Sequence, residues 1–323
     1  VSLAIPDEDG KMLVYSSTQH PSEGQKLVAE VLNIPLSHVT VQVRRMGGAF
    51  GGKETNANQW ACLAALLANK TSRPVRLKLS RAEDFILTGK RHPFLSKYQV
   101  GFSPSGEILG LEIDLFGDCG MSPDLSDAIV DRAMFHIDNC YYLASVTVRG
   151  YRVKTNKVSN TAFRGFGGPQ GILAIENVIE EIASATGLDP LVVRQRNFYR
   201  PSDNRDTTHY GQRIEQHIIQ PLVARLIINS EYHKRKNEIH QFNKTSAVLK
   251  RGIAITPVKF GISFTVTHLN QAGALLHVYT DGSVQLNHGG TEMGQGLYTK
   301  VVQIVATTCL LYTSPSPRDR IAS

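Results

Sequence analysis

The chain has 323 residues, 41% of them hydrophobic and 20% charged, so it is long enough for two domains and has the composition of a soluble globular protein. Its net charge of +7 suits an anionic ligand, but the basic residues are dispersed apart from the run at 233–236, so we expect no nucleic-acid partner. No apolar stretch is long enough to cross a bilayer and the four cysteines form no C-x-x-C pair, so we expect no membrane association and a reducing, cytoplasmic compartment.

The first part of the chain alternates predicted strands and helices. Apolar alternation predicts strands at 11–19, 39–45, 75–80, 96–102, 108–116 and 145–154, with a hairpin turn at 103–106. Helical periodicity predicts helices at 22–33, from Glu54 to about residue 69 and at 170–186, and Asp189 with Pro190 is typical of a further helix start. The first of these helices is predicted to carry Leu27, Val28, Val31 and Leu32 on one face.

The second part begins with a polar, turn-rich segment at 200–212, which indicates a linker or an insertion-tolerant loop. Beyond a helical region to about residue 243, strands are predicted at 252–257, 260–265, 272–280 and 284–288, the last two joined by a turn at Asp281 and Gly282. A helix is predicted from Gln295. This mixture predicts an α+β protein with two related-looking halves rather than a repeat array.

Three loops concentrate the glycines of the chain. The loops at 46–54, 163–171 and 289–296 hold 12 of the 27 glycines in 26 positions, where uniform scatter would place about two. Glycine allows close backbone approach and positive φ at an entropic cost that plain turns seldom require. Each loop also carries a chemically useful side chain, namely Glu54, Arg164 and Gln295. The loops therefore predict one large, anionic, hydrogen-bonding ligand held from three parts of the chain.

The first loop also fits a different motif. Gly47, Gly52 and Lys53 match the G-x-x-x-x-G-K of a phosphate-binding loop. That motif continues with Ser or Thr to ligate magnesium, whereas Glu54 would place a carboxylate beside the phosphates. A nucleotide triphosphatase is therefore disfavoured.

Seven ordered motifs carry a resemblance that covers residues 19 to about 310. They are STQHP, RRMGGAFGGKE, DRAMFHIDNCY, NTAFRGFGGPQG, KFGISFT, LNQAGALLHVYTDGSV and GGTEMGQG. With these motifs the chain resembles the molybdenum-cofactor portion of the xanthine dehydrogenase/oxidase family. The resemblance implies two mixed α/β subdomains of a molybdopterin-binding domain, the second one truncated. We expect a first molybdopterin-binding domain at 1–215, the start of a second at 216–310 and a non-native tail at 311–323, where the sequence becomes abruptly polar.

The resemblance implies a cofactor site built on the three loops. In the family, molybdenum is held by a pterin dithiolene and carries oxo and sulfido ligands. No side chain ligates the metal, but Gln19, Phe50 and Arg164 are expected to contact its ligands, and Gln295 the pterin and its phosphate. Gly51 and Gly167 are expected to let backbone lie against the cofactor.

The resemblance also implies a purine pocket. Glu54 and Arg132 match the polar pair that orients a purine, and Phe166 and Phe264 match the aromatic pair that sandwiches it, with Thr265 adjoining. Arg132 would neutralise charge developing on the ring. Simpler interpretations stay open, because Arg132 also suits a surface ion pair with Asp131 or Asp138, and both phenylalanines suit a core.

Two departures indicate a fragment of an enzyme. The family's general base is a glutamate in a G-E-P motif, and no G-E-P occurs in this sequence. Its 2Fe–2S and FAD modules are also missing and are expected on the same full-length chain or on a partner subunit, in a homo-oligomer. We expect oxidation of hypoxanthine and xanthine to uric acid. The alternatives are an aldehyde oxidase or other aromatic-heterocycle hydroxylase, and a non-catalytic cofactor-binding protein.

Overall fold

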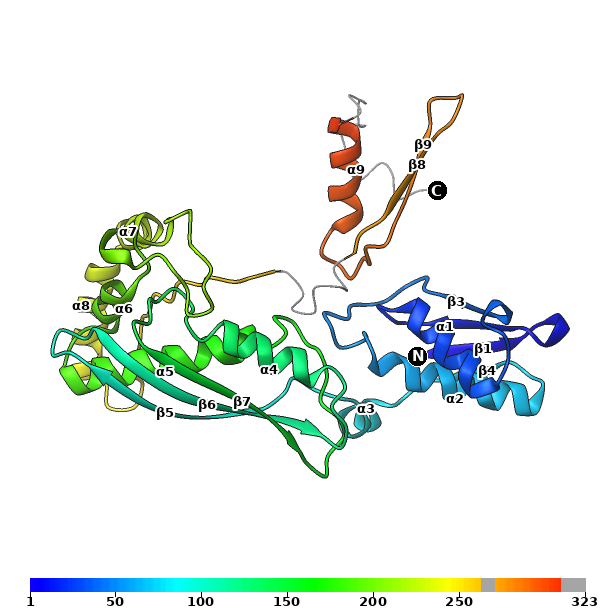
Figure 1. Ribbon diagram of the computed structural model, residues 1–323, viewed down its shortest axis with the longest axis horizontal. Coiled ribbons are helices and arrows are strands. Elements are labelled where there is room, and N and C mark those ends of the chain that lie inside the picture. Colours follow the sequence, from blue (N-terminus) through cyan, green and yellow to red (C-terminus); the bar gives the residue numbers. More distant parts are fainter. Residues whose placement is uncertain (263–270, 309–323) are drawn as a thin grey trace. The chain divides into compact units, whose positions relative to one another are not determined.

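A computed structural model describes residues 1–262 and 271–308 of the chain (Figure 1). The chain divides into two compact units. The first contains Val1–Arg91, Val158–Arg164 and the described residues that follow 265, and the second contains His92–Lys157 and residues 165–262. No helix among the described residues is both long and apolar enough to pass through a membrane.

The first unit is built on a four-stranded sheet with the order β3-β2-β1-β4. Its strands are β1 (Ser2–Pro6), β2 (Met12–Ser16), β3 (Val39–Gln42) and β4 (Val75–Leu77). Strand β1 runs antiparallel to β2 and β4, and β2 pairs with β3 in parallel. The helices α1 (Pro21–Leu32) and α2 (Asn56–Thr71) pack against this sheet, and α3 (Arg81–Leu87) follows β4 (Figure 1). Two short 3₁₀ helices, η1 (Glu8–Gly10) and η2 (Leu36–His38), complete it.

Alanines form most of the contact between α2 and the sheet. Ala61, Ala64, Ala65 and Ala68 are at most 1% exposed, in one cluster with Ala4, Val14 and Val28. Small side chains at i, i+3, i+4 and i+7 place the helix close to the strands. The predicted helix is thus confirmed, but it begins at Asn56, and Glu54 lies two residues before it.

A hairpin and a helix form the later part of the first unit. Strands β8 (Ala274–Val278) and β9 (Val284–His288) pair antiparallel, and α9 (Leu297–Thr308) follows the third glycine loop. The amide of Gly282 donates to the carbonyl of Tyr279 and closes the predicted turn. These predicted elements are confirmed.

The second unit has a three-stranded sheet with helices on one face. The order is β5-β6-β7, with β5 (Phe94–Phe102) antiparallel and β7 (Val146–Lys154) parallel to β6 (Ile108–Gly120). The helices α4 (Ser126–Phe135) and α5 (Gly168–Thr186) cover that face, and α6 (Pro190–Asn197), η3 (Ser202–Asn204), α7 (Ile219–Asn229) and α8 (Tyr232–Thr245) follow (Figure 1).

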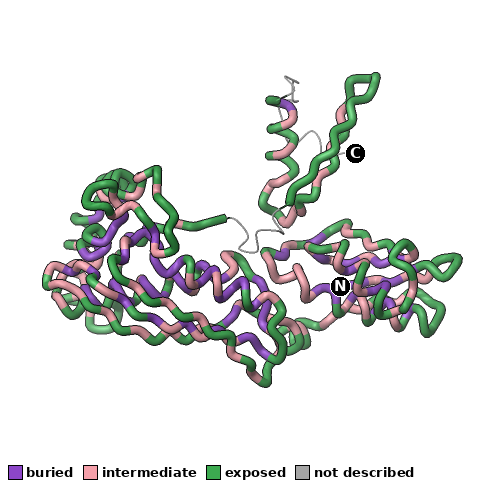
Figure 2. The backbone as a smooth tube through the Cα atoms, in the orientation of Figure 1, coloured by how far each residue is buried: buried purple, intermediate pink, exposed green. Residues whose placement is uncertain are grey.

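The core of this unit lies between α5 and the sheet. One stripe of α5 is buried, comprising Ala174, Ile175, Val178, Ile179 and Ile182, and it meets Ile113 and Leu115 of β6 (Figure 2). Spacing at i, i+1, i+4, i+5 and i+8 is that of an amphipathic helix. Asp189 caps α6 by accepting a hydrogen bond from the amide of Leu191 at 2.8 Å, which confirms the predicted helix start.

Several predictions about the elements were wrong or incomplete. The strands predicted at 252–257 and at 260–262 are absent among the described residues, and this segment is irregular backbone held by side chains of the second unit. Residues 263–265 of that predicted strand lie outside the described residues. Of the apolar residues predicted on one face of α1, Val28 is buried and Val31 is 47% exposed. The elements β1, α3 and α4 were not predicted, and in α4 the apolar residues are interrupted by charged ones.

Candidate functional site

Gln19 is fixed by the first glycine loop. Its side-chain Oε1 accepts hydrogen bonds from the backbone amides of Gly51, at 2.8 Å, and Lys53, at 3.3 Å. Its own amide donates to the carbonyl of Lys53 at 2.9 Å. Since backbone amides only donate, the carbonyl end of the side chain must face the loop and the NH₂ end must point elsewhere. Gln19 therefore presents a hydrogen-bond donor, as binding of an oxo or other anionic ligand requires.

Lys53 closes the base of the same loop. Its Nζ donates to the hydroxyl of Ser17, at 2.8 Å, and to the carbonyl of Met46, at 2.7 Å. Burial lowers the pKa of Lys53 from its usual value. A lysine that bonds the ends of its own loop does not reach out to a nucleotide, which agrees with the argument against a phosphate-binding loop.

The first two glycine loops meet within the first unit. Phe50 and Gly51 have φ of +52° and +96°, and a Cβ added to Gly51 would lie 3.2 Å from the carbonyl group of Ala162 and from Cα of Phe163. The guanidinium of Arg164 lies 5.8 Å from the centre of the Phe50 ring. Glycine at position 51 is thus required by the packing of one loop on the other, in addition to any approach to a cofactor.

Arg91 contacts the start of the second glycine loop. Its Nη2 donates to the carbonyl of Arg164 at 2.6 Å, and its guanidinium lies 4.8 Å from the centre of the Phe163 ring. A cavity of about 960 Å³ adjoins both loops and is lined, among others, by Gly47, Gly48, Phe50 and Phe163. The charged side chains on its wall are Lys53, Lys78, Arg81, Asp84, Lys90 and Arg91, so the wall is mainly basic. These residues fit an anionic, hydrogen-bonding group.

The third glycine loop is organised by its own side chains. Gln295 accepts from the amide of Met293, at 2.6 Å, and donates to the carbonyl of Thr291, at 2.8 Å. Glu292, which the sequence analysis passed over, accepts from the amides of Gly294, Gly296 and Tyr298 before α9. Hydrogen bonds from these amides lower the pKa of Glu292. Both polar ends of Gln295 are therefore used inside the loop, and its expected contact with a pterin stays a prediction.

Arg132 is a buried cation in the second unit. It lies in α4, is 5% exposed, and donates through Nη1 to the carbonyl of Gly261. Its guanidinium lies 5.8 Å from the Phe166 ring centre and 5.6 Å from that of Phe260. The surface ion pair considered for Arg132 is wrong, because Asp131 pairs with Arg152, and Asp138 pairs with Lys259 at 2.6 Å.

Glycines of the second loop bring α5 against α4. A Cβ on Gly167 would lie 2.0 Å from the carbonyl oxygen of Ile129, and one on Gly171 would lie 2.2 Å from that of Ala133. The φ of Gly167 is +95°, where it caps α5. Close packing of the helix that carries Arg132 thus requires these glycines. The expected approach of Gly167 to a cofactor stays a prediction.

The remaining predicted residues are placed as follows. Glu54 is half-buried and its amide donates to the carbonyl of Gly51 at 3.1 Å. Phe264 and Thr265 lie outside the described residues. The described residues contain no group of three His, Cys, Asp or Glu side chains that would hold a metal ion.

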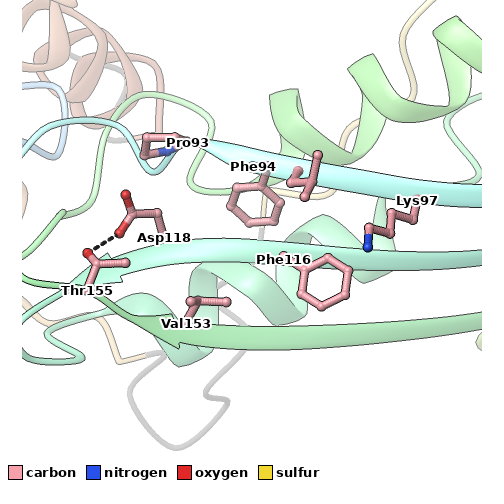
Figure 3. Close-up of a pocket in the computed structure, with 8 residues that line it drawn as sticks. Pro93, Phe94, Lys97, Phe116, Asp118, Val153 and Thr155 are labelled. Atoms are coloured by element: carbon pink, nitrogen blue, oxygen red, sulfur yellow. Dashed lines mark hydrogen bonds between the residues drawn. The ribbon is translucent and has the colours of Figure 1, made fainter.

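A second cavity, of about 490 Å³, lies in the second unit on the three-stranded sheet (Figure 3). Apolar side chains of Phe94, Phe116 and Val153 line it, together with Lys97, Asp118 and Thr155. None of the residues predicted for the site belongs to it.

The bonds made by the polar residues that follow Arg132 were not predicted from the sequence, which indicated Asp138 only as an ion-pair partner for Arg132. His136, Asp138 and Asn139 follow Arg132 in the chain, and all three bond to the segment 257–261. Their signal was present in the motif DRAMFHIDNCY, where polar residues interrupt an apolar run. The local sequence did not indicate which residues these side chains would contact.

Comparison with known proteins matches both parts of the chain. A model of the molybdopterin cofactor-binding domain matches residues 1–198, and a second model with the same description matches residues 225–313. Xanthine dehydrogenase of Drosophila subobscura is 47% identical over 325 residues, which cover 99% of this chain and 24% of that protein. Xanthine dehydrogenase/oxidase of Felis catus is 47% identical over 314 residues, covering 97% and 23%.

A relative with a different name is equally similar. Nicotinate hydroxylase of Emericella nidulans is 47% identical over 308 residues, covering 94% of this chain and 23% of that protein. The chain thus spans about a quarter of the length of the curated relatives it matches.

Solved structures share the fold. Quinoline 2-oxidoreductase from Pseudomonas putida matches with a TM-score of 0.75 and 23% identity, over 94% of this chain and 40% of that chain. Aldehyde oxidoreductase from Desulfovibrio gigas matches with a TM-score of 0.69 and 24% identity, over 88% and 30%. The α+β class is confirmed, and because a single family model covers more than half of the residues, the chain belongs to the molybdopterin cofactor-binding domain family.

Proposed function

We propose that this chain is the molybdenum-cofactor portion of a xanthine dehydrogenase that hydroxylates hypoxanthine and xanthine towards uric acid. The proposal rests chiefly on Arg132, a guanidinium that is 5% exposed and lies beside two phenylalanine rings. A buried guanidinium is well placed to stabilise a purine ring that gains negative charge during attack, because electrostatic interactions are strong where water is excluded. The 47% identity to two proteins named for xanthine supports this choice of substrate.

On this proposal, Gln19 and residues of the three glycine loops hold the cofactor. Gln19 would donate a hydrogen bond from its NH₂ group, and Phe50 and Arg164 would lie beside the ligands of the metal. Gly51 and Gly167 would let the backbone lie against the cofactor. Gln295 would reach the pterin if it exchanged its bonds within the third loop. When bound, the group supplies a two-electron acceptor and a water-derived oxygen for the ring carbon. The chain's own residues orient the substrate, exclude water and compensate charge.

The substrate roles are likewise proposals. Glu54 and Arg132 would hydrogen bond to polar edges of the purine, and Phe166, Phe264 and Thr265 would bound its faces. The general base, the 2Fe–2S and FAD modules, a homo-oligomeric state and a cytoplasmic location are proposed for the full-length protein. The domain division at 1–215 and 216–310 is kept as a proposal too, with 311–323 as a non-native tail.

A second candidate function is hydroxylation of another heteroaromatic ring. It is favoured by the 47% identity to a nicotinate hydroxylase. A carboxylate on the ring is a natural partner for a buried guanidinium, because arginine binds carboxylates through two parallel hydrogen bonds. Arg132 therefore suits nicotinate as well as a purine, whereas it offers nothing specific to a simple aldehyde.

Substrate competition in the full-length enzyme distinguishes these functions. We expect kcat/KM for xanthine to exceed that for nicotinate and for benzaldehyde. The double variant Glu54→Val with Arg132→Met should lower xanthine turnover by orders of magnitude while sparing benzaldehyde, because a site that loses its polar partners rejects a polar ring. Higher kcat/KM for nicotinate in the wild-type enzyme would establish the second function, and equal loss for xanthine and benzaldehyde would make the pair structural.

A further inference from the structure

His136 makes two hydrogen bonds that determine its protonation. Its Nδ1 lies 2.9 Å from the carbonyl oxygen of Arg132, one turn earlier in α4, and its Nε2 lies 3.0 Å from the amide nitrogen of Gly261. A carbonyl only accepts and an amide only donates. Nδ1 must therefore carry the hydrogen and Nε2 the lone pair. The ring is neutral and is 7% exposed as a residue.

These bonds complete a closed circuit around Arg132. The backbone carbonyl of Arg132 accepts from His136, His136 accepts from the amide of Gly261, and the carbonyl of Gly261 accepts from Nη1 of Arg132. The imidazole of His136 and the backbone of Gly261 thus connect the main chain of Arg132 with its own guanidinium. The centre of the Phe260 ring lies 4.8 Å from the centre of the His136 ring.

The segment 257–261 is also anchored independently of His136. The amide of Lys259 donates to Oδ1 of Asn139 at 3.0 Å, and Nδ2 of Asn139 donates to the carbonyl of Pro257 at 2.9 Å. Nζ of Lys259 donates to Asp138 at 2.6 Å. Loss of the His136 ring should therefore leave the segment in place and release only the orientation of Gly261.

We propose that His136 is a positioning residue for the substrate, which aims the Arg132 guanidinium by holding Gly261 in hydrogen-bonding orientation. The inference rests on the proposed function, because it assigns to Arg132 the recognition of a polar heteroaromatic ring. His136 does not touch the substrate. Its contribution is to fix the direction of the hydrogen bond between the Arg132 guanidinium and the carbonyl of Gly261.

The circuit works only with a neutral ring. A protonated His136 would turn a hydrogen towards the amide of Gly261, where two donors would face each other. It would also place a positive charge near Arg132 and Lys259, which Asp138 offsets in part. Burial lowers the pKa of His136 below its usual value of 6.5, and Arg132 and Lys259 act in the same direction. Recognition of the substrate's heteroaromatic ring by Arg132 should therefore weaken as the pH falls through the lowered pKa of His136.

The test uses the full-length enzyme and the ratio of kcat/KM for xanthine to kcat/KM for benzaldehyde between pH 5 and 8. The ratio cancels the titration of a general base that serves both substrates. His136→Leu should lower the ratio about tenfold at neutral pH, the loss expected from one well-placed hydrogen bond. His136→Gln can accept from Gly261 without titrating, so it should restore the ratio and remove its decline in acid.

His209→Leu is the matched control. His209 is also buried, with its Nε2 3.0 Å from the carbonyl of Met134 and its Nδ1 3.8 Å from Asp138, and burial lowers its pKa too. No hydrogen bond links His209 to Gly261. The ratio of kcat/KM for xanthine to kcat/KM for benzaldehyde in His209→Leu should therefore follow that of the wild-type enzyme at every pH. Molybdenum content is measured for all variants, so that the ratio is compared at equal loading.

The outcomes separate the inference from the proposed function. A wild-type ratio in His136→Leu, or a decline in acid that persists in His136→Gln, would overturn the positioning role while the proposed function stands. Xanthine left unoxidised by the wild-type enzyme would overturn both. A tenfold loss in His136→Leu that His136→Gln restores supports the inference.

Discussion

The amide of Gly51 donates to the side-chain oxygen of Gln19 at 2.8 Å, across 32 residues of sequence. This bond joins the STQHP motif to the first glycine loop and sets which end of Gln19 is available to a ligand. It also fixes the backbone of Gly51 at φ +96°, against the carbonyl of Ala162. One glycine thus links two motifs that the sequence presents separately.

Gly51→Val in the full-length enzyme is expected to abolish molybdenum loading. Its Cβ would lie 3.2 Å from backbone atoms of Ala162 and Phe163, which cannot move aside as a flexible side chain would. Gly47→Val is the control, since Gly47 has φ +70° in the same loop but nothing within 4 Å of an added Cβ. Metal content and released pterin are measured on both. Full loading of Gly51→Val would show that the contact between the loops is unimportant for the cofactor.

Gln295→Ala is expected to weaken loading without abolishing it. The variant loses two hydrogen bonds inside the third loop, each of order 1 kcal/mol net. Because Glu292 still accepts from three amides of the loop and of α9, the loop should keep its shape. The affinity for the cofactor is measured by reconstitution with released cofactor at graded concentrations. Complete loss of binding would mean that Gln295 contributes far more than these bonds.

Gly167→Ala is expected to separate α4 from α5. The added methyl group would lie 2.0 Å from the carbonyl oxygen of Ile129, so the helices must part or the protein must fail to fold. Gly187→Ala, at φ +70° with open space around it, should cost only about 1 kcal/mol of backbone strain. Hydrogen exchange of peptides from both helices is the measurement. Equal protection of α4 and α5 from hydrogen exchange in Gly167→Ala and Gly187→Ala would contradict the conclusion that Gly167 is required for the packing of the two helices.

Glu176→Gln is expected to destabilise the second unit much more than Glu180→Gln. Glu176 accepts from Asn139, Tyr141 and Arg194, and Arg194 is 2% exposed, so the change leaves a buried cation short of its partner. Breaking such a pair costs about 3–5 kcal/mol. Glu180, at 49% side-chain exposure, bonds the same arginine from the surface, where a pair contributes about 0–1 kcal/mol.

The two variants are compared by hydrogen exchange of peptides from α5 and α6, which reports local opening of the second unit in a multidomain protein. Similar losses of protection would show that Arg194 is equally well compensated by either carboxylate.

Asp118 is expected to make the end of β7 sensitive to acid. Burial alone would raise its pKa, but hydrogen bonds from Lys157, Thr155 and the amide of Gly120 outweigh burial and lower the pKa below 3.8 (Figure 3). A carboxylate with a lowered folded pKa stabilises the protein above its unfolded pKa, and this stability is lost as the pH falls through the folded value. Protection of residues 153–157 should therefore fall below about pH 4, and Asp118→Asn should remove this dependence. An unchanged pH profile in Asp118→Asn would assign the effect to another group.

Local pattern was sufficient for most elements of this chain. Burial of one helical face or of alternate strand residues leaves a period of 3.6 or 2 in the sequence, so α1, α2, α5, β5, β6 and the β8–β9 hairpin were predicted with errors of a few residues. The clustered glycines likewise marked three loops of interest, because glycine suits crowded backbone, whereas Gln19 was identified only through the family resemblance. The irregular segments 252–257 and 260–262 were wrongly predicted as strands, since alternating apolar residues look the same whether backbone or side chains form the hydrogen bonds that hold them.

The partners of the site residues were decided only by tertiary structure. Arg132 and Gly261 are separated by 129 residues, and nothing in either motif states that one donates to the other. Gly167 was expected to face a cofactor, yet the packing of α5 on α4 requires a glycine there before any ligand is considered. The sequence determined which residues are able to bind a ligand or transfer a proton, because that ability belongs to the side chain itself. Which of them act together depends on distances set by the packing of helices and sheets, and those distances exist only in the folded chain.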